Sequence, residues 1–335
     1  MPQEFGLALV VLVIGTILAV YGWNEAAPGR PNTFLNFDNF IDGIATPMSY
    51  YAIMAVGVTI VIITGGIDIS VGSVMALSAL GAAAAMQNLP ADASAMQVLP
   101  VAICVPLGIG LLCGLINGGL IVGLNLHPFI VTLGTMSIFR GLANVLPAEK
   151  TLPSAGRQLP AAFTTDFMRI ELFGIQPMPL VIMLLCILAG GFYLRVMITG
   201  RETYAIGGNE EAARFSGLRV GWIKLRTYAI AGLTAGIAGM VSVGRFGTAS
   251  TSTATGYELT VIAAAVVGGA SLIGGRGTAL GALFGTLVIA LIENGILILR
   301  LAQEYRLVII GAAIIVAVAL DRLSAHLRSR RSAKS

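Results

Sequence analysis

Residues 45–73 read ATPMSYYAIMAVGVTIVIITGGIDISVGS, and the first twenty of them carry no charged side chain. An apolar run of about 20 residues is long enough to cross the hydrocarbon core of a bilayer as a helix. Gly65 and Gly66 then interrupt the run, and a second, Ala-rich apolar segment follows. This stretch predicts a membrane helix, a break and a second membrane helix.

The whole chain has the composition of a membrane protein. Of its 335 residues 56% are hydrophobic and only 11% are charged, whereas soluble domains carry about 25% charged residues. So few charges cannot cover a soluble surface, which excludes a soluble enzyme, a nucleic-acid-binding protein and a disordered chain. The basic isoelectric point of about 9.1 does not indicate nucleic acid, because the basic residues lie beside apolar runs.

Ten apolar runs are expected to cross the bilayer, so the fold class is all-α integral membrane, with one transmembrane domain over residues 1–335. The first run lacks a basic n-region and a clear cleavage site, and we expect an anchor helix there rather than a removed signal peptide. The runs are 5–23, 45–64, 70–87, 98–122, 127–146, 178–198, 223–243, 257–273, 278–299 and 304–321.

Lysine and arginine in the loops set the expected orientation, because cytoplasmic loops carry the excess of basic residues. Placing loop 199–222 and the basic tail 322–335 in the cytoplasm, with loop 147–177 outside, puts more lysine and arginine on the cytoplasmic side than on the external side. Both termini are then expected in the cytoplasm.

Patterns typical of catalysis or metal binding are missing from the sequence. It contains no phosphate-binding P-loop, no H-E-x-x-H and no G-x-S-x-G, and only two histidines. We therefore expect no catalytic residue, no metal site and no cofactor. Within the apolar runs we find few carboxylates, chiefly Glu258 and Glu293, which disfavours a proton-coupled carrier.

The most polar predicted cytoplasmic segment is 199–222. Asn209 can cap a short helix whose first turn carries Glu210 and Glu211, and Gly217 can end that helix. A helix of about two turns is unstable alone and needs a partner surface. The residues leave two interpretations open: an ordinary interfacial loop, or a docking helix for a soluble motor subunit.

The sequence Glu211-Ala212-Ala213 followed by Gly217 resembles the E-A-A-x-x-x-G docking motif of ABC importer permeases. Four stretches in order, ITGGIDISVGS, GGNEEAAR, GYEL and VGGASL, resemble the monosaccharide permeases of the ribose/xylose/arabinose/galactose type. They occupy residues 63–73, 207–214, 256–259 and 267–272. The resemblance extends over about residues 45–321.

The resemblance implies a transport complex in the bacterial cytoplasmic (inner) membrane. Its partners are a cytoplasmic ATP-binding subunit, an extracytoplasmic sugar-binding protein and a second permease, either another copy or a paralogue. The implied ATPase-coupling residues are Glu210, Glu211, Ala212, Ala213 and Gly217.

The residues leave other functions open. Related permeases carry nucleosides, branched-chain amino acids or autoinducer-like sugars. An ion-coupled carrier and an intramembrane enzyme are the readings that the residues favour least.

The sequence concentrates no aromatic and charged residues into a strong sugar site, so we expect a weakly polar conduit. Its proposed lining residues are Asn117, Thr132, Thr135 and Asn294. Hydrogen bonding between helices is the alternative role for each of them. Asp68 or Ser70 is expected to cap the third helix.

Two further patterns concern packing. A shift of 203 residues aligns Gly65 and Gly66 with Gly268 and Gly269 and gives eight identities over residues 58–80. It predicts a parallel repeat of helices 2–3 and 8–9, or else a convergent use of small residues. Glycines spaced by four indicate close helix packing; they are Gly110, Gly114 and Gly118, then Gly232 and Gly236, and Gly277, Gly281 and Gly285.

Overall fold

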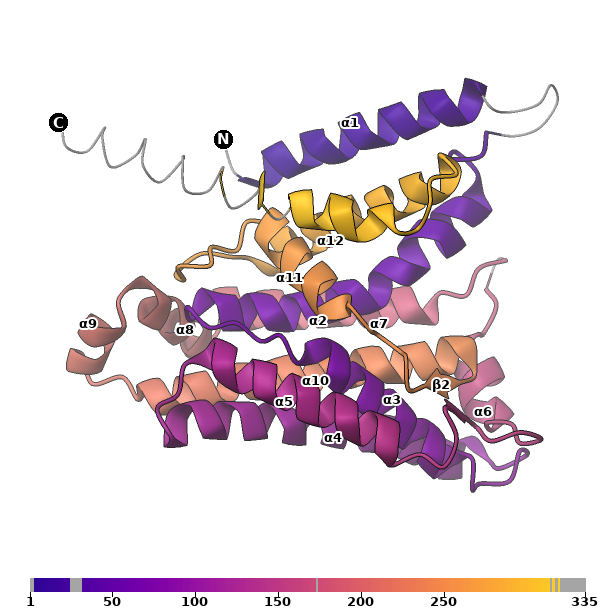
Figure 1. Cartoon of the computed structure of the whole chain (residues 1–335), viewed down its shortest axis with the longest axis horizontal. Helices are drawn as coiled ribbons and strands as arrows, with labels where there is room; N and C mark the ends of the chain where they lie inside the picture. Colours follow the sequence, from indigo (N-terminus) through magenta and orange to yellow (C-terminus); the bar gives the residue numbers. More distant parts are fainter. Residues whose placement is uncertain (1–2, 25–31, 173, 314, 317–318, 320–335) are drawn as a thin grey trace.

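The computed structural model describes residues 3–24, 32–172, 174–313, 315–316 and 319. The predicted basic tail, 322–335, lies outside these residues. Long helices run side by side, with α8 and α9 at one end of the molecule and α6, β1 and β2 at the other (Figure 1). We call these the α9 end and the β2 end.

The elements follow one another as helices with two very short strands. They are α1 (Gln3–Asn24), the π-helix η1 (Asn39–Ala45), α2 (Thr46–Ile63), α3 (Val71–Met86), α4 (Ala95–Gly123), α5 (Pro128–Val145), β1 (Thr151–Leu152), α6 (Ala161–Phe163), the π-helix η2 (Thr164–Met168), α7 (Met178–Arg195), α8 (Ile198–Gly208), α9 (Glu210–Phe215), α10 (Val220–Phe246), β2 (Ala249–Ser250), α11 (Tyr257–Val267) and α12 (Ala279–Ile298).

The predicted all-α membrane fold is confirmed in its coarse form. Within the described ranges, seven helices are long and apolar enough to cross a membrane, and α3 and α11 are shorter apolar helices. Residues 305–313 form a further helix. The predicted run 257–273 is too long, because α11 ends at Val267, where Gly269 takes φ +94° and turns the chain.

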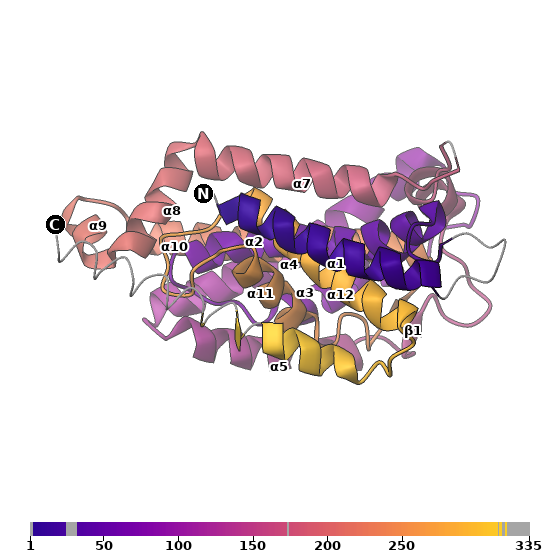
Figure 2. The same ribbon diagram turned by 90° about the horizontal axis from the view of Figure 1, so that it is seen from above.

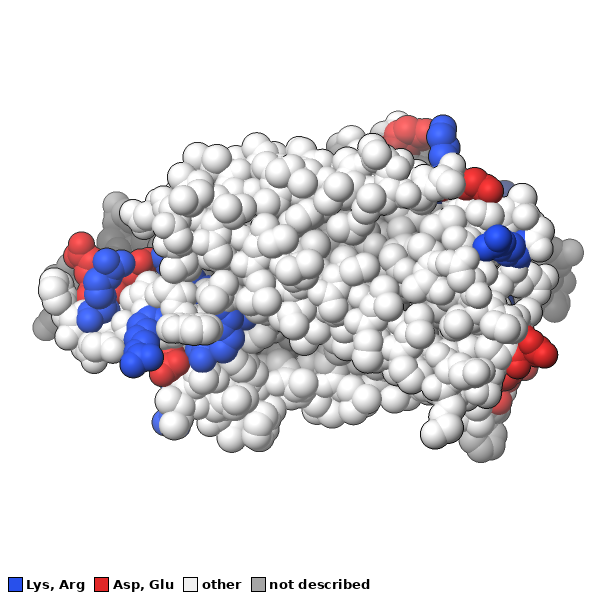
Figure 3. All heavy atoms as spheres, turned by 90° about the horizontal axis from the view of Figure 1, so that it is seen from below, with Lys and Arg blue, Asp and Glu red and all other residues white. Residues whose placement is uncertain are grey.

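Helix α2 forms the centre of the core, since Pro47 is its only residue that is not buried. Helix α10 packs on α4, α2 and α3, and α1 lies at the surface on α12 (Figure 2). Helices α1, α4, α5 and α7 expose many large apolar side chains. On the face shown in Figure 3, charged side chains gather at the two ends, with an uncharged belt between them, as expected for a chain whose middle lies in lipid.

The predicted glycine packing is confirmed between α4 and α10. A methyl group at Gly110 would overlap the carbonyl oxygen of Gly232, and one at Gly114 would overlap that of Tyr228. The same holds for Gly281 and Gly285 of α12, which lie on the backbone of α11 and the residues after it. Small residues allow this approach of backbones, which drives helix association in lipid.

Helices α2 and α11 each end in a turn with the same hydrogen-bond pattern. Gly65 N donates to Ile62 O and Gly66 N to Val61 O, while Gly269 N donates to Val266 O and Ala270 N to Ala265 O. The residue after each helix cap has a positive φ, +77° at Gly65 and +94° at Gly269. The two helix ends therefore correspond at a shift of 204 residues, one more than the shift that aligns the sequences.

The two predicted loops contain short elements. Loop 147–177 contains β1, α6 and η2, and β1 pairs antiparallel with β2 through Thr151 and Ser250. Loop 199–222 is mostly helical, because α8 precedes the expected short helix. Polar residues at the start of α8 concealed its helical character in the sequence.

The α4–α10 contact generates a stability prediction. We expect Gly114→Ala to destabilise the protein by about 1–3 kcal/mol, the usual cost of overpacking, because the added methyl meets backbone that cannot move aside. The matched control is Gly119→Ala on the same helix, where nothing lies within 4 Å of the added carbon. Melting of the detergent-solubilised protein measures both; equal melting temperatures would contradict the packing.

Candidate functional site

The short helix α9 forms as the sequence predicts. Asn209 has an extended backbone, and its Oδ1 accepts a hydrogen bond from Ala212 N at 2.9 Å. Gly217 has φ +84°, and the amides of Gly217 and Leu218 donate to the last turn of the helix. A left-handed backbone suits glycine, so Gly217 sets where α9 ends.

Helix α9 is held on its neighbours by one apolar cluster and one ion pair. Ala213 packs with Ile206 of α8 and with Val220 and Ile223 of α10. Glu210 accepts from Lys224 Nζ of α10 at 2.7 Å. The position of α9 is therefore tied to α10, the helix that packs on α2, α3 and α4.

The other face of α9 is open. Glu211, Ala212, Arg214 and Phe215 are exposed, and the Phe215 side chain is 89% exposed. Phe215 is not among the residues predicted from the sequence, although an aromatic residue in an otherwise polar segment is a signal that could have found it. An exposed aromatic beside charged groups is typical of an interaction surface.

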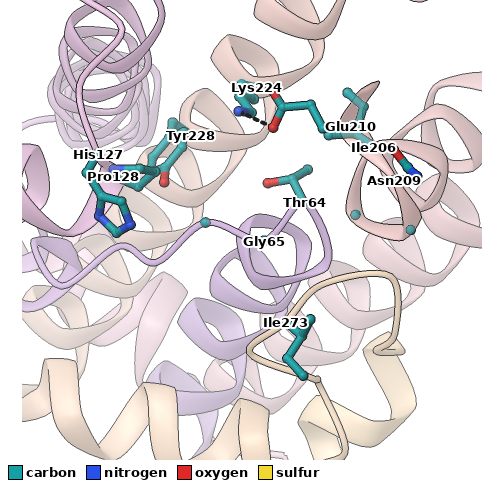
Figure 4. A pocket seen from close by; sticks show the side chains of 13 residues that line it. Thr64, Gly65, His127, Pro128, Ile206, Asn209, Glu210, Lys224, Tyr228 and Ile273 are labelled. Atoms are coloured by element: carbon teal, nitrogen blue, oxygen red, sulfur yellow. Dashed lines mark hydrogen bonds and ion pairs between the residues drawn. The ribbon is translucent and has the colours of Figure 1, made fainter. Parts of the chain in front are cut away.

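A cavity of about 440 Å³ lies beside α9 at the same end of the molecule. Figure 4 shows it bounded by the Glu210–Lys224 pair on one side and by Tyr228, His127 and Pro128 on another. The residues around it come from α8, α9, α10, the start of α5, the loop after α11 and the end of α2: Thr64, Gly65, Gly66, His127, Pro128, Ile206, Gly207, Gly208, Asn209, Glu210, Lys224, Tyr228 and Ile273.

Helix α8 joins α9 to the end of α2 and to the loop after α11. Gly275 N donates to Ile63 O at 2.8 Å, and Gly207 lies directly against both groups. Tyr204 Oη donates to Gly277 O at 2.6 Å, and burial raises the pKa of Tyr204, which keeps the phenol protonated as a donor. Helix α8 therefore contacts both the end of α2 and the loop after α11.

The break between α2 and α3 contains a buried polar network. Asp68 Oδ1 accepts from Ser70 N at 2.9 Å and from Ser70 Oγ at 2.7 Å, and Asn117 Nδ2 of α4 donates to Ser70 Oγ at 2.8 Å. Tyr228 Oη of α10 donates to Ile67 O at 3.3 Å. The expected side-chain capping of α3 by Asp68 or Ser70 is not found: the N-cap residue Ser70 makes no side-chain hydrogen bond to an α3 amide, and Asp68 bonds to the amide of Ser70, which precedes the helix.

The structure places the four proposed path residues in two separate regions. Asn117 bonds within the α2–α3 break, Thr132 Oγ1 reaches Ile67 O at 3.3 Å, and Thr135 bonds to Thr132 O. Asn294 of α12 pairs instead with Asn39 of η1, with its Nδ2 donating at 2.7 Å. All four are buried and engaged in hydrogen bonds that connect segments or turns.

This architecture, with long apolar helices and charged groups near the two ends, is that of a multi-pass membrane protein. Residues 40–318 match the model of the family described as branched-chain amino acid transport system / permease component. The chain belongs to this permease family.

Curated relatives align over nearly the whole chain. The ribose import permease protein RbsC of Escherichia coli K12 is 36% identical over 328 residues, 96% of this chain and 94% of the relative. RbsC of Bacillus subtilis 168 is 41% identical over 321 residues, 96% and 93% of the two chains. The D-allose transport system permease protein AlsC of Escherichia coli K12 is 35% identical over 322 residues, 95% and 90%. No solved structure matches the chain.

The polar network generates a prediction. Ser70→Ala leaves Asn117 without its partner and Asp68 with one donor fewer, so we expect stability to fall by about 1–3 kcal/mol. Ser137→Ala is the control, because the exposed Ser137 hydroxyl bonds only to Leu133 O of its own helix. Thermal melting in detergent compares the two; a Ser70→Ala protein as stable as the control variant would contradict the network.

Proposed function

We propose that the chain is the membrane-spanning permease subunit of an ATP-driven importer of monosaccharides. The observation that carries the proposal is the group of relatives named for ribose and allose import, aligned over at least 95% of this chain. The sequence contains no P-loop, so ATP hydrolysis falls to a separate cytoplasmic subunit.

The proposed membrane topology has ten crossings with both termini in the cytoplasm. They comprise the seven long helices, α3, α11 and the helix that begins at residue 305. The arginines and lysine between 195 and 226 make the α9 end basic and support its cytoplasmic placement. A parallel repeat of α2–α3 and α11–α12 is part of the proposal, supported by the matching turns that end α2 and α11.

The proposed docking site for the ATP-binding subunit is α9, with Glu210, Glu211, Ala212, Ala213 and Gly217. Within it, Glu211 and Phe215 are free to meet a partner, whereas Ala213 and Glu210 hold α9 to its own subunit. This division suits a coupling helix, which must contact the motor on one face and transmit its displacement through the other.

The transmission route that we propose runs through α10. A displaced α9 acts on Lys224 through Glu210, and Tyr228, one turn further along α10, holds Ile67 O in the α2–α3 break. A second route runs from α8 through Gly207 to the end of α2. Movement of the break then opens or closes the path near Asn117, Thr132 and Thr135, and Asn294 joins the path when its pair with Asn39 opens.

Two partners complete the proposed importer. An extracytoplasmic binding protein selects the sugar and delivers it at the β2 end, and a second permease, a copy or a paralogue, forms the other wall of the path. The second candidate function is import of a branched-chain amino acid, which the description of the family model favours.

Reconstitution tests the function directly. The permease is expected to co-purify with an ATP-binding subunit and, with a binding protein, to accumulate D-ribose or D-allose in vesicles only when ATP is present. Uphill accumulation by the permease alone would overturn the proposal.

Charge reversal on α9 gives a sharper test. We expect Glu211→Lys to lower ATP-driven uptake about tenfold or more, because a wrong charge at a docking interface costs several kcal/mol, while the amount of protein in the membrane stays the same. Glu171→Lys is the matched control, because this glutamate near the β2 end is also exposed. Replacement of Gly217 by valine, which strains its left-handed backbone, is expected to act like Glu211→Lys; normal uptake by both α9 variants would refute docking there.

A further inference from the structure

A second cavity, of about 280 Å³, lies at the β2 end, opposite α9. Its lining residues belong to the end of α10, the loop through β2, the start of α11 and single positions of α2 and α3. Its volume is near the lower end of ligand pockets, which run from about 300 to 1,000 Å³. The cavity therefore suits a small solute.

Hydroxyl groups dominate the polar lining of this cavity. Ser242 of α10 is only 5% exposed, lines the cavity and forms no hydrogen bond with any described residue. The Ser242 hydroxyl oxygen is not one of the buried polar atoms that lack a partner, so it is open to the cavity, where it can donate to and accept from a ligand hydroxyl or a water molecule. The hydroxyl-bearing lining residues are Ser242, Thr248, Ser250, Ser252, Thr253 and Thr255, together with the phenols of Tyr50 and Tyr257.

Arg140 of α5 fixes the loop that carries most of these hydroxyls. Its guanidinium donates to the carbonyl oxygens of Thr253 at 2.8 Å and of Thr251 and Ala254 at 3.3 Å. The antiparallel pairing of β2 with β1 holds the other side of the loop. The hydroxyl array is thus positioned in advance, which lowers the entropy cost of binding.

Stacked aromatic rings form one wall. The rings of Tyr50 and Tyr257 lie parallel, 6.0 Å apart, and Tyr51 packs against both. Arg306 supports them from behind, because it donates to Tyr51 Oη at 2.8 Å and pairs with Glu293 at 2.7 Å. Tyrosines offer a flat apolar face together with a polar tip, which fits the alternating C–H and O–H surface of a sugar ring.

The charge of the lining distinguishes the two candidate substrates. Among the described residues that line this cavity, none is charged. An amino acid carries both a carboxylate and an ammonium group, and burying either without a charged partner is expensive. A neutral polyol needs only hydroxyl partners and an apolar face.

We propose that this cavity receives the neutral sugar when it enters the permease, with Ser242, Ser252 and the Tyr50–Tyr257 wall as its contacts. The inference rests on the proposed function and narrows it, since it favours a monosaccharide over a branched-chain amino acid as the ligand. It also places the first contact of the sugar beside Met75, five residues after Ser70 of the α2–α3 break.

Cysteine labelling tests the site in the full-length permease without any binding protein. Ser252→Cys places a thiol on an exposed lining position, and Ala155→Cys places one on an exposed loop of the same end that does not line the cavity. A membrane-impermeant maleimide added from outside should label both. D-ribose or D-allose should slow the labelling of Ser252→Cys only, and L-leucine should slow neither; the unmutated protein, with its three native cysteines, gives the background.

The outcomes separate the two levels of the proposal. Absence of external labelling at both cysteines would refute the proposed orientation, and with it the proposed function. The sugar site would be overturned if no sugar slowed the labelling of Ser252→Cys, or if L-leucine slowed it instead. The proposed function would still stand in that case if the reconstituted wild-type complex imported sugar.

Transport supplies the second readout. In the reconstituted importer at saturating loaded binding protein, Ser242→Ala should lower sugar uptake about two- to tenfold, the effect of one hydrogen bond. The ATPase rate without sugar should not change. Ser78→Ala is the control, because this buried hydroxyl also lacks a partner but does not line the cavity; equal uptake by the two variants would contradict the inference.

Discussion

The bilayer forbids unpaired backbone polar groups, and the arrangement of the α2–α3 break follows from that constraint. Where α2 ends, inside the protein core, its free carbonyl groups need donors from other segments. Gly275 N donates to Ile63 O, and the hydroxyl groups of Tyr228 and Thr132 both donate to Ile67 O in the segment that follows α2. Three other parts of the chain must therefore meet at this break: helix α10, helix α5 and the loop that follows α11. This requirement fixes their positions relative to one another and to the break.

Glycine permits the close approach that such a junction needs. Helices α4 and α10 touch backbone to backbone through Gly110, Gly114 and Gly232, and Gly207 of α8 lies against Ile63 and Gly275. Lipid offers no hydrophobic driving force between helices, so van der Waals packing and interhelical hydrogen bonds carry the association. The tight core around α2 and the exposed apolar faces of α1, α4, α5 and α7 are two consequences of the same solvent.

The same contacts suit a protein that is driven from one end. The α9 end has a charged and aromatic surface and connects, through contacts of α8 and α10, to the α2–α3 break. The β2 end offers a cavity lined with hydroxyl groups and tyrosines. Met75, near the start of α3, lines that cavity, so the proposed docking surface and the proposed sugar site both connect to the α2–α3 break.

The sequence by itself determined the membrane class, nearly all of the apolar helices and the capped helix α9, because these depend on local hydrophobicity and on residues within one turn. Even so, α11 is shorter than its apolar run, since Gly269 turns the chain before the hydrophobic residues end. Only the tertiary structure decided that Ser70 bonds to Asp68 and Asn117 instead of capping α3, that Asn294 pairs with Asn39, and that six hydroxyl side chains surround one cavity. Each of those outcomes depends on which distant segments meet, and hydrogen-bonding groups of the same kind are interchangeable until the packing of the backbone selects their partners.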